Sequence, residues 1–72
     1  MTDNIIEVTS ENFVDAVIKG SEKLPVIVDF WAPWCSPCKQ LTPIIEKAVN
    51  NFPDKVILAK VNIDDNQSIA SQ

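Results

Sequence analysis

The segment at residues 26–31 constrains the fold most, because it is apolar on both faces except at Asp29. Successive side chains of a strand point to opposite faces, so this strand must be covered from both sides. Such a pattern is typical of a buried parallel strand. Residues 5–8 and 56–63 are also predicted to be strands, because each is an apolar, β-branched run bounded by turn residues.

Two segments between these strands have apolar residues at helical spacing. In the first, Ser10 is a candidate N-cap and Gly20 a candidate helix end. Its predicted apolar face consists of Phe13, Val14, Val17 and Ile18. The second runs from residue 36 to about residue 51 and contains Pro43. Its predicted apolar stripe consists of Leu41, Ile44, Ile45, Ala48, Val49 and Phe52.

The element order is therefore strand, helix, strand, helix, strand and the start of a further helix after Asp64 and Asp65. A connection between parallel strands of one sheet is right-handed. This order predicts an α/β fold of βαβαβ type with a parallel three-stranded sheet.

Composition excludes several classes of function. The chain has 72 residues, enough for one small domain, with ten acidic residues, six basic residues and a net charge of -4. That charge repels a phosphate backbone, so we expect no nucleic-acid partner. No apolar run approaches the roughly 20 residues of a membrane span, and the start of the chain is not basic as in a signal peptide. We expect no membrane association and a cytoplasmic location.

The only two cysteines, Cys35 and Cys38, follow the predicted strand at residues 26–31 and open the second predicted helix. Free backbone N–H groups and the positive end of the helix dipole stabilise an anion at that position. Cys35 is thus a candidate nucleophile and Cys38 a candidate resolving thiol in thiol-disulfide exchange. Ser36 and Pro37 separate the two sulfurs and are expected to tune the reduction potential.

Other interpretations of the pair remain open. The cysteines could be unrelated core residues, or a structural staple, although a loop this short gains little from closure. A structural zinc site needs about four ligands, and without histidine only a dimer that shares two pairs would supply them. We expect neither a metal nor a cofactor.

Asp29 is the only charged residue in the predicted strand at residues 26–31, where an ionised carboxylate is costly. A carboxyl group beneath the dithiol is a candidate acceptor for the proton of Cys38. The alternatives are an aspartate at a hydrated strand end or a structural pair with Lys60 in the third strand. Trp34 precedes Cys35 and is a candidate substrate contact, with simple packing as the alternative.

Residues 28–39, VDFWAPWCSPCK, and residues 59–64, AKVNID, resemble the thioredoxin family. The resemblance implies a thioredoxin-like fold, with Cys35 as attacking thiol, Cys38 as resolving thiol, Asp29 as proton acceptor and Lys60 as its neighbour. It also implies a reductase of protein disulfides that receives its electrons from a reductase partner.

The sequence departs from the family in two places. Ser36 stands where the family usually has glycine, and the sequence ends before the cis-proline loop and the C-terminal ββα unit. We therefore expect residues 1–72 to be a partial thioredoxin domain with an exposed sheet edge, and activity to be reduced or absent without that unit.

A narrower resemblance defines a second hypothesis. Residues 39–46, 57–60 and 69–72 are similar to thioredoxin domains fused to tetratricopeptide-like helices in bacterial chaperones. On that hypothesis the domain is a binding module that holds unfolded client proteins.

Overall fold

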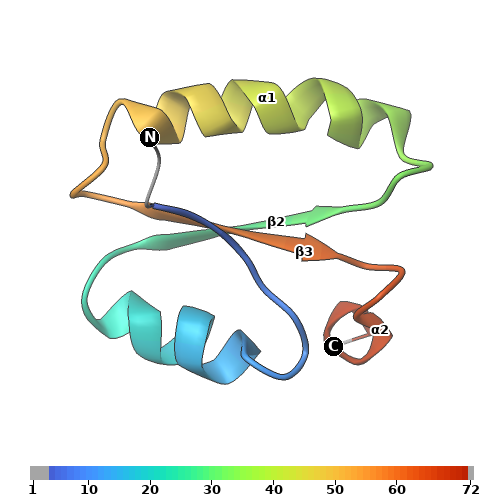
Figure 1. Ribbon diagram of the computed structural model, residues 1–72, viewed down its shortest axis with the longest axis horizontal. Coiled ribbons are helices and arrows are strands. Elements are labelled where there is room, and N and C mark those ends of the chain that lie inside the picture. The colour runs from blue at the N-terminus through green and yellow to red at the C-terminus, as the bar shows by residue number, and fades with distance from the viewer. Residues whose placement is uncertain (1–3, 72) are drawn as a thin grey trace.

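Three parallel strands form one sheet in the order β1-β3-β2 (Figure 1). The computed structural model describes residues 4–71. Residues 1–3, on which the expectation about a signal peptide depends, lie outside the described residues, as does Gln72, the last residue of the segment 69–72 compared above with chaperone-fused domains. The elements are β1 (Ile5–Glu7), the π-helix η1 (Val14–Lys19), the 3-10 helix η2 (Gly20–Glu22), β2 (Val26–Trp31), α1 (Ser36–Asn50), β3 (Ile57–Asn62) and α2 (Gln67–Ala70). The predicted α/β class and three-stranded parallel sheet are confirmed.

Helices cover both faces of the sheet. In Figure 1, α1 crosses one face, and η1 and α2 lie on the other. The core on the η1 side contains Val8, Val17, Ala59 and Val61, each at most 8% exposed. Burial of a valine side chain stabilises a fold by roughly 1.5–3 kcal/mol. The central strand β3 is thereby held between two layers.

The first helix differs from the prediction at its start and in the side chains that it buries. Ser10 does not cap it, because its backbone N–H donates a hydrogen bond of 2.8 Å to Asn66 Oδ1 and the chain stays a loop until Phe13 occupies the N-cap position. Gly20 is the C-cap residue of η1, as predicted, although its φ of -62° is helical and η2 follows directly. Val14 and Ile18, predicted to face the core, are more than half exposed.

The orientation of α1 also differs from the predicted one. Val49 is buried, but three members of the predicted stripe, Leu41, Ile44 and Phe52, are more than half exposed. Polar side chains of α1, Thr42 and Glu46, instead bond to groups of the sheet. Hydrophobic spacing located the helix correctly, and these polar contacts determine which side faces the sheet.

β2 is an edge of the sheet, as expected from the sequence. It pairs with β3 from Val26↔Ile57 to Trp31↔Asn62, and no other strand of residues 4–71 pairs with it. Ile27 and Phe30 are 43% and 45% exposed. The strand that leads into the cysteines therefore has one free side within the described chain.

Candidate dithiol site

The two cysteines are joined by a disulfide at the N-terminus of α1, with their Cα atoms 5.2 Å apart. Cys35 is the N-cap residue, in extended conformation at φ -92° and ψ 98°. Its Sγ accepts a hydrogen bond of 3.3 Å from the backbone N–H of Cys38. A sulfur atom thus takes the role that a serine or aspartate oxygen has in an ordinary N-cap.

Ser36 and Pro37 form the first turn of α1. Proline is tolerated there because its missing N–H would have had no partner within the helix. Pro37 has no N–H to offer to Cys35 Sγ, and the N–H of the next residue, Cys38, makes the bond. Both Ser36 and Pro37 are exposed.

Trp34 lies beside the disulfide with 68% of its surface exposed. Its Nε1 donates to both carboxylate oxygens of Asp64, at 3.0 and 3.1 Å. Asp64 lies directly after β3, so this bond ties the cysteine loop to the neighbouring loop. The indole is held by its edge while its face remains available to another molecule.

Three charged residues form a row across the sheet beneath α1. In the strand register, Glu7 is paired with Lys60, and Lys60 is paired with Asp29. Cross-strand partners point to the same face. Asp29 is 7% exposed, and its Oδ2 accepts a hydrogen bond of 3.0 Å from Thr42 Oγ1 on α1.

Lys60 forms its ion pairs with glutamates rather than with Asp29. Its Nζ is 2.8 Å from Glu46 Oε2 and 3.8 Å from Glu7 Oε1, and it lies 5.8 Å from the centre of the Trp31 ring. The hydrogen bond to Glu46 is the main cause of a raised pKa of Lys60, and it outweighs the opposing effect of burial. Asp29 contributes only the smallest of the three charge effects.

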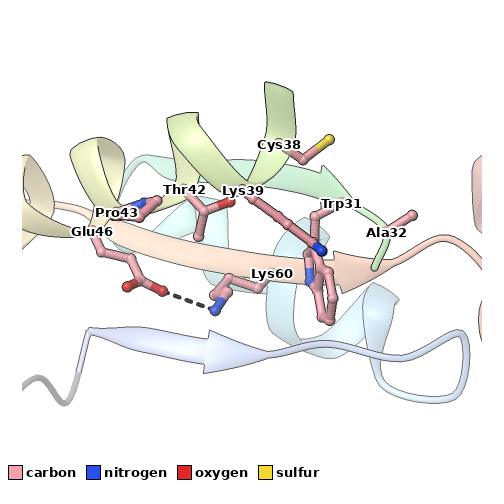
Figure 2. Close-up of a pocket in the computed structure, with 8 residues that line it drawn as sticks. All are labelled: Trp31, Ala32, Cys38, Lys39, Thr42, Pro43, Glu46 and Lys60. Atoms are coloured by element: carbon pink, nitrogen blue, oxygen red, sulfur yellow. Dashed lines mark ion pairs between the residues drawn. The ribbon is translucent and has the colours of Figure 1, made fainter. Parts of the chain in front are cut away.

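A pocket of about 240 Å³ lies between α1 and the sheet, alongside these groups. Figure 2 shows Cys38 at one end, the Glu46–Lys60 pair at the other, and Thr42 between them. Cys38 Sγ is 3.9 Å from the carbonyl oxygen of Phe30, the residue that follows Asp29. The pocket therefore runs from the dithiol to the charged row.

Neither a metal cluster nor a membrane helix occurs in the described part of the chain. Within residues 4–71, no three His, Cys, Asp or Glu side chains come together in a way that would hold a metal ion. The helices of the same residues are too short or too polar to cross a bilayer.

The structure adds residues that the sequence reasoning did not select, namely Thr42, Glu46 and Asp64. Thr42 and Glu46 continue the series from Cys38 at intervals of four residues, which places all three on one side of a helix. That spacing was a usable signal. No local pattern in the sequence indicates the contact between Asp64 and Trp34, which are thirty residues apart.

A parallel α/β sheet with a CxxC disulfide at the start of its crossover helix defines a class of dithiol proteins. Comparison with known proteins specifies the family: residues 4–72 match the family model of thioredoxin. The chain is 42% identical over 66 residues to thioredoxin of Thiocapsa roseopersicina, an alignment that covers 92% of this chain and 70% of the relative. It therefore belongs to the thioredoxin family.

Two further relatives have similar coverage. Identity is 45% with thioredoxin 1 of Synechococcus elongatus, over 90% of this chain and 59% of the relative. It is 51% with thioredoxin of Rickettsia bellii, over 90% of this chain and 60% of the relative. The chain thus spans between 59% and 70% of the length of these three relatives.

Proposed function

We propose that this protein is a thiol-disulfide oxidoreductase of thioredoxin type, which reduces disulfides of other proteins through Cys35 and Cys38. The observation that carries the proposal is the Cys35–Cys38 disulfide at the N-terminus of α1, with the Cys38 N–H directed at Cys35 Sγ. A donor in that position stabilises a negative sulfur. Membership of the thioredoxin family supports the same reaction.

In the proposed cycle, the Cys35 thiolate attacks one sulfur of a substrate disulfide and expels the other as a thiolate. Cys38 then attacks Cys35 Sγ, which releases the second substrate sulfur and closes the Cys35–Cys38 disulfide. The substrate gains two electrons, and the protein loses two. A reductase partner returns these electrons in the next step.

The neighbouring residues receive roles on the same proposal. Asp29 accepts the proton of Cys38 during resolution. This role is supported by the burial of Asp29 and by the contact of Cys38 Sγ with the carbonyl oxygen of the next residue, Phe30. Trp34 contacts substrate through its exposed indole. Ser36, Pro37 and Lys60 tune the reduction potential, the first two through the helix start and Lys60 through its charge beneath the site.

We place the reaction in the cytoplasm, where thiols are kept reduced and a cysteine pair is more often catalytic than structural. The substrates on this proposal are proteins with accessible disulfides. The relatives described above are named thioredoxins, which favours the reductase over the client-binding alternative.

The test is the reduction of insulin disulfides with dithiothreitol as electron source. We expect the protein to accelerate insulin precipitation, and the Cys35→Ser variant to give only the rate of dithiothreitol alone. The Cys38→Ser variant should instead accumulate a mixed disulfide with substrate, detected by mass spectrometry.

Ser21→Ala is a matched control, because it alters an exposed hydroxyl that bonds only to the Ile18 carbonyl. It should retain the activity of the unaltered protein. Equal activity of Cys35→Ser and the unaltered protein would refute the proposed function.

A further inference from the structure

We propose that Thr42 is a positioning residue for Asp29: its hydroxyl orients the carboxylate to accept the proton of Cys38 when the mixed disulfide is resolved. This inference rests on the proposed function. It assigns a role to a residue on α1 that lies outside the CxxC motif.

The Thr42 hydroxyl contacts the Asp29 carboxylate directly. Thr42 Oγ1 lies 3.0 Å from Asp29 Oδ2, within the normal range for a hydrogen bond. Within residues 4–71 it is the only hydrogen bond to the Asp29 side chain. Because Asp29 is 7% exposed, water has little access to replace a lost donor.

The Thr42 side chain is directed from α1 toward the sheet. A threonine within a helix commonly bonds back to the carbonyl four residues earlier. Here the hydroxyl crosses from α1 to the sheet instead, and Figure 2 shows the side chain extending toward β3. Thr42 lies one helical turn after Cys38, so it connects the resolving cysteine with the strand that carries Asp29.

Lys60 does not form an ion pair with Asp29. Lys60 is the register partner of Asp29, but its ammonium group pairs with Glu46 and Glu7. Asp29 is therefore held by a neutral donor, while the cation beside it is largely balanced by the two glutamates. Lys60 on β3 is the charged register partner of Asp29. The other charged or titratable groups around Lys60 and the pocket are Glu7 on β1, and Cys38, Lys39 and Glu46 on α1.

The step on which Thr42 acts is the resolution of the mixed disulfide. The Cys38 thiol transfers its proton to the Asp29 carboxylate, and Cys38 Sγ forms a bond with Cys35 Sγ. The bond between Cys35 Sγ and the substrate sulfur breaks, and its electron pair leaves with the substrate as a thiolate. The hydrogen bond from Thr42 holds the carboxylate that accepts this proton in one orientation, and its loss should slow the transfer.

The experiment uses stopped-flow reaction of the reduced protein with dithiobis-nitrobenzoate across a range of pH. Attack by Cys35 releases one thionitrobenzoate, and resolution by Cys38 releases the second, so the two phases report the two cysteines separately. In Thr42→Val we expect the second phase to slow by about tenfold, the effect of losing a hydrogen bond to a charged group. The first phase should keep the wild-type rate.

Thr42→Ser keeps the hydroxyl and should restore the wild-type profile, which a purely steric role of Thr42 does not predict. Thr42→Ala is a second variant without the hydroxyl and should behave as Thr42→Val. In an Asp29→Asn background, Thr42→Val should cause no further slowing of the second phase. Thr9→Val is the matched control, since it makes the same chemical change at an exposed residue of the β1–η1 loop.

The outcomes separate this inference from the proposed function. Absence of the first phase in the unaltered protein would refute the oxidoreductase function itself. A normal first phase, together with identical second-phase profiles in wild type, Thr42→Val and Thr42→Ala, would refute the role of Thr42 alone.

Discussion

The ammonium group of Lys60 lies between two carboxylates of different elements, Glu46 on α1 and Glu7 on β1. This arrangement raises the pKa of Lys60 above its ordinary value of 10.5, and the hydrogen bond to Glu46 is the largest cause. Because the pKa is higher in the folded state, the pair stabilises the fold fully below pH 10.5. That stabilisation is lost as the pH rises through the folded value.

We predict that Glu46→Gln lowers the pKa of Lys60, because it weakens the hydrogen bond and removes the largest of the three charge effects. Nuclear magnetic resonance titration of the Lys60 side chain measures this directly. The free energy of unfolding near neutral pH should fall by no more than about 1 kcal/mol, the usual limit for a partly exposed ion pair. The difference from wild type should disappear at pH values above the folded pKa.

Glu11→Gln is the control for this prediction, since Glu11 is exposed and the substitution removes the same charge. It should leave the titration of Lys60 unchanged. A Lys60 titration that is identical in Glu46→Gln and Glu11→Gln would show that Glu46 does not determine the charge state of Lys60.

At the residue scale, the sequence correctly predicted that the cysteines lie at a helix start and Asp29 in a strand, because these positions are local information. The partners of these residues were harder to find. A pair of Asp29 with Lys60 was one alternative from the sequence, but Lys60 pairs with Glu46 and Glu7, and Asp29 accepts a hydrogen bond from Thr42. Such choices depend on how α1 is rotated over the sheet.

At the element scale, two loops at one end of the sheet are joined by a single amide side chain. Asn66 is 6% exposed, its Oδ1 accepts from the Ser10 N–H at 2.8 Å, and its Nδ2 donates to the Asn62 carbonyl at 2.9 Å. The loop before η1 is thereby fixed to the loop after β3. The same loop after β3 carries Asp64, the partner of Trp34.

We predict that Asn66→Ala lowers the free energy of unfolding by about 1–3 kcal/mol, because it removes two part-buried hydrogen bonds, to the Ser10 N–H and the Asn62 carbonyl. This is a large part of the roughly 5–15 kcal/mol that stabilises a typical domain. Urea denaturation measures the change. Gln67→Ala, at the exposed neighbouring position, is the control, and equal midpoints for the two variants would contradict the structural role of Asn66.

Hydrophobic periodicity predicted the existence and type of the strands and of α1, but the buried side of α1 only in part. Val49 faces the core as predicted, whereas Leu41 and Ile44 are exposed. The helical spacing of apolar residues identifies an apolar stripe on the helix, but it does not show how much of that stripe the sheet covers. For η1, the spacing predicted a helix, and the exposed Val14 and Ile18 show the same limit.

At the scale of the whole molecule, apolar surface is concentrated at β2 and on α1. β2 is an edge strand, and its Ile27 projects to the same face as Asp29, the face that α1 covers. Ile27, Leu41 and Ile44 are all more than two-fifths exposed. An apolar edge strand is a site at which chains pair with one another.

We therefore predict that the 72-residue chain self-associates through β2, with an apparent mass in light scattering that rises with protein concentration. Ile27→Lys should reduce this association, because a charged side chain at a sheet edge opposes pairing with a second strand. Val14→Lys is the matched control, since it replaces a residue that is 57% exposed on η1, on the opposite face of the sheet. An equal reduction by both variants would assign the association to general hydrophobicity, and a mass independent of concentration would contradict the prediction.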